Sequence, residues 1–137
     1  MQALCNLAKD YGPLLGRILI ALIFLKSGVE KIIGFSAVAG FMTLKGMPAA
    51  EVLLVGSIVF EIAGGLMVLL GWYARWGALL LIAFIVPATL IFHNFWTLEG
   101  AQYMNQVNHF MKNLSILGAL VFILGMGPGP LSLRKES

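Results

Sequence analysis

The sequence AEVLLVGSIVFEIAGGLMVLL, residues 50–70, decides the fold class of this chain. It is apolar almost throughout, and its only charged side chains are Glu51 at the start and Glu61 near the middle. A helix needs about 20 mostly apolar residues to cross the ~30 Å hydrocarbon core of a bilayer. Residues 50–70 are therefore predicted to span a membrane.

Three more apolar segments have the same character. Ala74 to Phe95 follows residues 50–70 after only Gly71, Trp72 and Tyr73, a turn too short to cross a bilayer, so the two segments must form an antiparallel hairpin. Leu14 to Phe35 and Asn108 to Met126 flank this hairpin. We therefore predict an all-α membrane protein, a bundle of four transmembrane helices with both termini on one side.

A shorter helix is predicted between the first two spans. Apolar residues recur at helical spacing from Phe35 to Lys45, and Gly46 follows as a helix stop. We expect this segment to lie in the membrane interface. Lys and Arg are more frequent at the end that carries the termini, so the positive-inside rule predicts cytoplasmic N- and C-termini.

The composition excludes several classes of function. Of the 137 residues, 60% are apolar and 11% charged, which makes a water-soluble protein improbable and leaves room for one domain, residues 1–137. The Lys and Arg residues are scattered, so membrane lipid is an expected partner and nucleic acid is not. Cys5 is the only cysteine, which excludes an internal disulfide or a two-thiol relay.

Two charged residues are predicted deep in the bilayer. Counting from Phe35 and from Glu51, Lys26 and Glu61 both lie roughly 13 to 15 Å below the outer boundary, at 1.5 Å per residue. Because charge exposed to lipid is costly, we expect Lys26 and Glu61 to face the bundle interior and to pair, or else to be neutral. Glu30 lies one turn above Lys26, whereas Lys31 is expected to extend to the lipid headgroups.

More polar groups gather at the outer ends of the third and fourth helices. We predict that these groups share one outward-opening, water-accessible pocket with the charged pair; they are His93, Trp96, His109, Lys112 and Asn113. A purely structural ion pair stays open as the alternative, since buried pairs also fix helix register. Haem or metal ligation by His93 and His109 is less favoured, because neither belongs to a ligand-spacing motif, so no metal site is predicted.

Five short motifs together resemble the DoxX family over nearly the whole chain. They occur in order at residues 24–34 (FLKSGVEKIIG), 60–71 (FEIAGGLMVLLG), 93–96 (HNFW), 110–118 (FMKNLSILG) and 127–133 (GPGPLSL). The resemblance implies a multi-pass protein of the bacterial inner membrane. Its characteristic polar positions correspond to Lys31, Glu61, His93, Trp96, Lys112 and Asn113. Lys26 and Glu30 are less typical, and Arg134 replaces a usual acidic residue.

The resemblance also implies a range of functions. Some members are membrane subunits of quinone-linked sulfur-oxidising enzymes, and others are associated with oxidative-stress defence. Our first hypothesis is a quinone-associated component of a redox system, in which Glu61, with His93 or His109, transfers protons and a partner redox protein supplies electrons. The alternatives are a non-enzymatic module that binds or transports a small polar or anionic solute near Lys26 and Lys112, and a scaffold subunit. Homo-oligomerisation also stays open.

Overall fold

The computed structural model describes residues 1–136, which form helices and no strand. In chain order the elements are α1 (Gln2–Ile33), α2 (Phe35–Leu44), α3 (Ala50–Leu70), α4 (Ala74–Phe92), the 3-10 helix η1 (Phe95–Thr97) and α5 (Gly100–Met126). Four of these helices, α1, α3, α4 and α5, are long and apolar enough to cross a membrane. The predicted four-span architecture with a short helix between the first two spans is confirmed.

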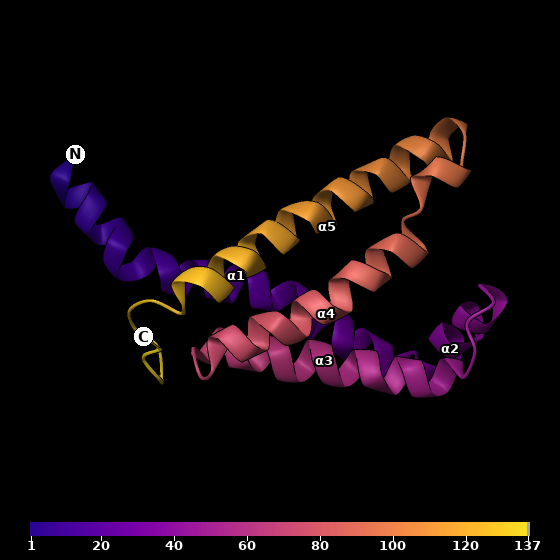
Figure 1. Ribbon diagram of the computed structural model, residues 1–137, viewed down its shortest axis with the longest axis horizontal. Coiled ribbons are helices and arrows are strands. Elements are labelled where there is room, and N and C mark those ends of the chain that lie inside the picture. The colour runs from indigo at the N-terminus through magenta and orange to yellow at the C-terminus, as the bar shows by residue number, and fades with distance from the viewer. Residues whose placement is uncertain (137) are drawn as a thin grey trace.

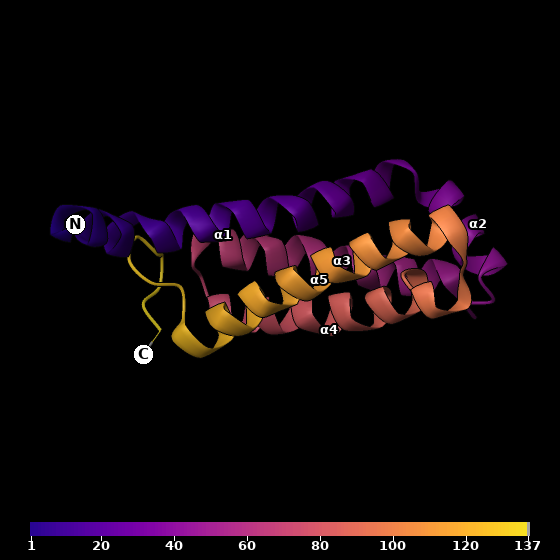
Figure 2. The same ribbon diagram turned by 90° about the horizontal axis from the view of Figure 1, so that it is seen from above.

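The four long helices run lengthwise through one bundle (Figures 1 and 2). The turn between α3 and α4 lies at the end where both termini lie, and α2 lies at the opposite end (Figure 1). The predicted antiparallel hairpin of α3 and α4 is therefore present, and both termini share one side of the bundle. Below, we call the end that carries α2 the distal end.

Glycines end two of the helices where the sequence predicts. Helix α3 covers the predicted residues 50–70, and Gly71 follows it with φ +64°. Gly46, with φ +79°, follows the end of α2. Glycine adopts this left-handed conformation without the steric penalty of a Cβ atom, so it stops a helix readily.

Three predicted boundaries were wrong by three residues or more. Helix α1 begins at Gln2 instead of Leu14, α5 begins at Gly100 instead of Asn108, and α4 ends at Phe92 rather than Phe95. The predicted starts were placed where the apolar run begins, whereas a helix continues through polar residues once it leaves the hydrocarbon region. His93 and Asn94 separate the end of α4 from η1, which begins at Phe95.

Small residues bring α3 close to both of its neighbours. A Cβ atom on Gly64 would lie 2.9 Å from Leu81 Cγ of α4, and one on Gly65 would lie 2.9 Å from Leu25 Cδ2 of α1. Such close approach is typical of membrane helices, which associate by tight packing because lipid is as apolar as the side chains. Helix α3 is therefore held centrally between α1 and α4.

Candidate functional site

A cavity of about 720 Å³ lies in the distal half of the bundle. Side chains of α1, α2, α3, α4 and α5 all line it, and most of them are apolar. The polar residues that line it are Ser27, Lys31, Ser57, Glu61, His93, Lys112 and Asn113. A large, mainly apolar cavity with a few converging polar groups is the usual form of a ligand-binding site.

An ion pair between α1 and α3 forms one side of this cavity. Lys31 Nζ lies 2.5 Å from Glu61 Oε2, and the Glu61 side chain is only 1% exposed. The same ammonium group lies 4.4 Å from the ring centroid of Phe84, within reach of a cation–π interaction. Lys31 thus compensates the buried carboxylate and presents its charge to the cavity.

The prediction that Lys26 pairs with Glu61 was wrong. Lys26 pairs instead with Glu30, on the outer face of α1, and neither residue lines the cavity. The reason is the direction in which each side chain leaves the helix. Gly28 and Lys31 lie on the face of α1 that meets α3. Lys26 lies five residues before Lys31 and therefore points about 140° away around the helix axis. The prediction that Lys31 extends to the headgroups was wrong for the same reason.

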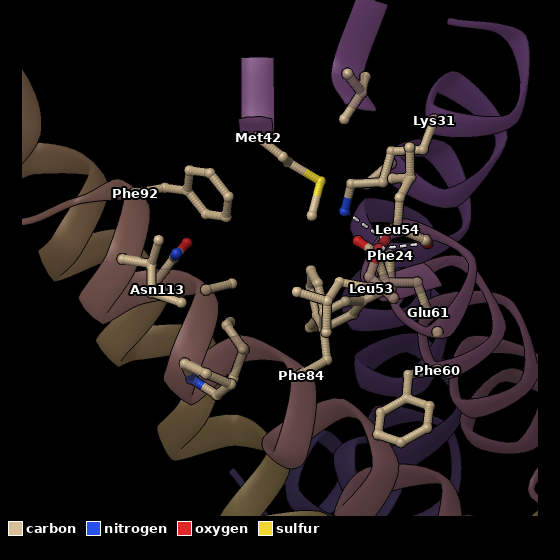
Figure 3. A pocket seen from close by; sticks show the side chains of 18 of the residues that line it. Phe24, Lys31, Met42, Leu53, Leu54, Phe60, Glu61, Phe84, Phe92 and Asn113 are labelled. Atoms are coloured by element: carbon tan, nitrogen blue, oxygen red, sulfur yellow. Dashed lines mark hydrogen bonds and ion pairs between the residues drawn. The ribbon is translucent and has the colours of Figure 1, made fainter. Parts of the chain in front are cut away.

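The opposite side of the cavity carries Asn113 of α5. Asn113 Nδ2 donates a hydrogen bond to Thr89 Oγ1 at 3.0 Å, and the Thr89 hydroxyl donates to the carbonyl of Ile85 at 2.6 Å. Figure 3 shows Asn113 and Phe92 on one side of the cavity, across from Lys31 and Glu61. Thr89 fixes the Asn113 amide, which leaves the Asn113 carbonyl oxygen as a free acceptor near the cavity.

Two histidines stack at the distal end of the site. The rings of His93 and His109 are 5.1 Å apart with an interplanar angle of 16°, and His93 Nδ1 lies 2.7 Å from Gln106 Oε1. His93 lines the cavity, and His109 lies behind it. Stacked rings do not point their nitrogens at a common centre as axial haem ligands do. Among residues 1–136, no three His, Cys, Asp or Glu side chains are grouped to hold a metal ion.

Of the predicted site residues, Lys31, Glu61, His93, Lys112 and Asn113 line the cavity. Lys26, Glu30, Trp96 and His109 do not. Trp96 is 56% exposed and packs edge-on against Phe95. Sequence reasoning missed Phe84, Thr89 and Gln106, because their roles come from contacts with residues on other segments.

Helix α2 covers part of the cavity at its distal end. The ring of Phe41 stacks on Phe92 at 6.0 Å, and the buried side chain of Met42 lines the cavity beside them. Figure 3 shows the Met42 side chain between Phe92 and Lys31. Helix α2 therefore packs against the end of α4 and covers part of the cavity.

Several known proteins are similar in sequence to this chain, and two of them are named as inner membrane proteins. The sequence profile of the DoxX family matches residues 12–94. The chain belongs to the DoxX family. Two Escherichia coli relatives are the inner membrane protein YphA, 31% identical over 90% of this chain and 88% of the relative, and the inner membrane protein YqjF, 34% identical over 93% and 92%.

A more distant relative is the Surfeit locus protein 4 homolog of Drosophila melanogaster, 26% identical over 96% of this chain but only 43% of its own length. No solved structure matches the chain significantly. The DoxX match includes Lys31, Glu61 and His93, three of the polar residues that line the cavity. This DoxX-family protein is thus an integral, multi-pass protein of the bacterial inner membrane.

Proposed function

We propose that this protein is a quinone-associated membrane component of a redox or oxidative-stress system, and that the cavity binds the quinone head group. The observation that carries the proposal is the cavity of about 720 Å³ with the Lys31–Glu61 ion pair on one side and Asn113 on the other. A quinone has two oxygens on opposite sides of an apolar ring. The cavity offers polar groups at two opposite places and apolar side chains between them.

The polar groups suit both oxidation states of such a ligand. The Lys31 ammonium group donates hydrogen bonds and never accepts them, so it suits a quinone carbonyl. The free oxygen of Asn113 accepts, so it suits a quinol hydroxyl. The aromatic rings of Phe84 and Phe92 provide apolar surface for the ring of the ligand.

The proposed reaction is the two-electron reduction of a quinone to a quinol, or its reverse. The quinone takes up two electrons and two protons, and each carbonyl oxygen becomes a hydroxyl. The electrons come from a partner redox protein, since the chain has a single cysteine and no flavin- or haem-binding motif identified in its sequence. Glu61 and His93 are the proposed proton carriers, because carboxylate and imidazole groups both exchange protons readily.

The site opens towards the outer side of the inner membrane in this proposal. The cavity lies in the half of the bundle away from the termini, and positive-inside logic favours cytoplasmic termini. His93, at the end of α4, then lies nearest to the outer water phase.

The apolar lining distinguishes this proposal from a site for a small polar solute. A polar solute would have to be surrounded by hydrogen-bonding groups, because unpaired polar groups are costly in an apolar cavity. Here the apolar side chains include Phe24, Phe60, Phe84 and Phe92. An amphiphile with a flat polar head and an apolar tail fits this lining better.

The experiment measures binding of a short-chain ubiquinone analogue to the protein in lipid nanodiscs. The double variant Lys31→Met with Glu61→Met removes both charges of the cavity pair, and we expect affinity to fall by about tenfold or more, the worth of a charged hydrogen bond. The matched control is Lys26→Met with Glu30→Met, which removes the other Lys–Glu pair, outside the cavity. Equal affinity of both double variants, or no binding by the unaltered protein, would contradict the proposal.

A further inference from the structure

A second charged pair lies on the outer face of α1, away from the cavity. Lys26 forms an ion pair with Glu30 one turn further along, and their side chains are 72% and 60% exposed. No other helix among the described residues covers them. In a membrane protein such residues normally face the bundle interior or a partner, so their exposure requires an explanation.

The packing of α1 on α3 fixes the depth of this pair. Gly28 meets Ile62 of α3, and Leu25 meets Gly65. Lys26 therefore lies level with the middle of α3, a helix that begins at Ala50 and ends at Leu70. The pair is thus within the hydrocarbon region rather than among the headgroups.

The residues around the pair form a continuous exposed stripe. Its residues are spaced alternately four and three positions apart along α1, which is the spacing of the residues that meet when two helices pair. They are Leu15, Leu19, Leu22, Lys26, Val29 and Ile33, all exposed, with Glu30 at the edge of the stripe. The charged pair therefore interrupts an otherwise apolar seam that no other segment of residues 1–136 covers.

We propose that a second copy of this chain covers the stripe, with α1 packed against α1 in a parallel, twofold-symmetric dimer. Copies inserted in one membrane with the same topology place equivalent residues at equal depth, and a twofold contact pairs each patch with itself. Lys26 of each copy then lies four residues, or about 6 Å along the helix axis, from the level of Glu30 of the other copy, within reach of a lysine side chain. The four charges form a closed network shielded from lipid.

Charge complementarity favours this occupant over lipid or another protein. Acyl chains offer no counter-charge at this depth, and an unrelated partner would need opposite charges at the same level in the bilayer. The stripe and its edge carry one charge of each sign, Lys26 and Glu30, in the arrangement that complements a second copy of the chain. A polar residue within an apolar seam also fixes register, as it does in coiled coils.

The first test uses two single variants that reverse one charge each. Lys26→Glu gives a stripe with two negative charges, and Glu30→Lys gives a stripe with two positive charges. Because like charges then meet across the interface, each variant alone is expected to dimerise at least about tenfold more weakly than the unaltered protein in nanodiscs or liposomes. Co-expressed with different tags, the two variants should associate with each other. The ion pair within one helix is broken in both variants, so a purely intrahelical role predicts no such recovery. Absence of a heterodimer would overturn the proposal.

The second test is disulfide crosslinking of cysteine variants in native membranes. These variants keep Lys26 and Glu30 unaltered. With Cys5→Ser in the background, Leu22→Cys on the stripe should crosslink to a dimer under mild oxidation. Phe122→Cys on the exposed face of α5 is the control, since that residue is 67% exposed but lies off the stripe. Crosslinking at neither position, or equally at both, would contradict the proposed interface. Quinone binding is measured separately and does not depend on either outcome.

Discussion

Lys31 Nζ of α1 lies 2.5 Å from Glu61 Oε2 of α3, beneath the distal helix α2 and against a largely apolar cavity. The carboxylate is nearly inaccessible, whereas the lysine side chain is 21% exposed. The two side chains of the pair therefore differ in exposure: the carboxylate of Glu61 is buried, whereas the ammonium group of Lys31 faces the cavity. This geometry holds α1 and α3 in register and places a hydrogen-bond donor where a ligand can meet it.

Removing the base alone should destabilise the bundle. Lys31→Met leaves the Glu61 carboxylate buried without a partner, and breaking a buried pair in this way costs about 3 to 5 kcal/mol. We expect a clear loss of thermal stability in detergent, followed by circular dichroism. Adding Glu61→Met to this variant should recover most of the loss, because two apolar side chains replace the pair. A Lys31→Met protein as stable as the unaltered one would show that the pair does not hold the helices.

The hydroxyl of Thr89 should matter for ligand affinity through Asn113. Thr89→Val keeps the shape of the side chain but removes the acceptor of the Asn113 amide, so the amide is free to rotate and its oxygen loses its fixed direction. We expect quinone affinity to fall several-fold, consistent with a loss of about 1 kcal/mol. Ser115→Ala is the control, because the Ser115 hydroxyl bonds to Met111 O within its own helix. Equal affinity of the two variants would count against a role for Asn113.

Close packing of α3 on α4 should make Gly64 intolerant of a side chain. A Cβ atom there would lie 3.0 Å from the carbonyl oxygen of Gly77, a backbone atom that cannot move aside easily. We expect Gly64→Ala to destabilise the protein by about 1 to 3 kcal/mol, the usual cost of overpacking. Gly118→Ala on α5 meets nothing within 4 Å and should be neutral or slightly stabilising. Thermal unfolding of both variants in the same detergent measures the difference.

The segment after α5 should depend on Arg17 for its attachment. Arg17, 2% exposed, donates from Nη2 to the carbonyl of Leu131 at 2.7 Å. Backbone bonds at 3.0 Å join Leu133 N to Leu70 O and Arg134 N to Gly71 O. We expect Arg17→Leu to loosen this segment and to speed its cleavage by trypsin after Arg134. Lys9→Leu, on the exposed part of α1, should leave the cleavage rate unchanged. Equal rates for both variants would show that Arg17 does not hold the segment.

The sequence predicts the membrane-buried parts of the fold well. The bounds of α3, its hairpin with α4 and the short helix α2 all follow from apolar runs ended by glycine. The starts of α1 and α5 do not follow, because those helices extend into water, where hydrophobicity no longer indicates a boundary. Depth along the bilayer is therefore easier to predict than helix length outside it.

The partner of Glu61 shows where depth alone fails. Depth counting favoured Lys26. However, the inward face of α1 is given by residues that recur in steps of four and three, namely Arg17, Ala21, Phe24, Gly28 and Lys31. Lys26 does not lie on this inward face. Helix periodicity applied to α1 contains the signal for Lys31, which the resemblance to the DoxX family also indicated. The size of the cavity and the contact between α2 and α4 depend on how side chains from several helices pack together. No pattern within one segment of the sequence indicates them.

Photoaffinity labelling with a short-chain azidoquinone in native membranes tests the central claim most directly. If the head group binds between the Lys31–Glu61 pair and Asn113, labelled peptides should contain residues 50–61 of α3 or 112–116 of α5, and excess unlabelled quinone should abolish the label. Label found only on α1 residues outside the cavity, such as Leu15 and Leu19, or label that excess quinone does not displace, would contradict the account.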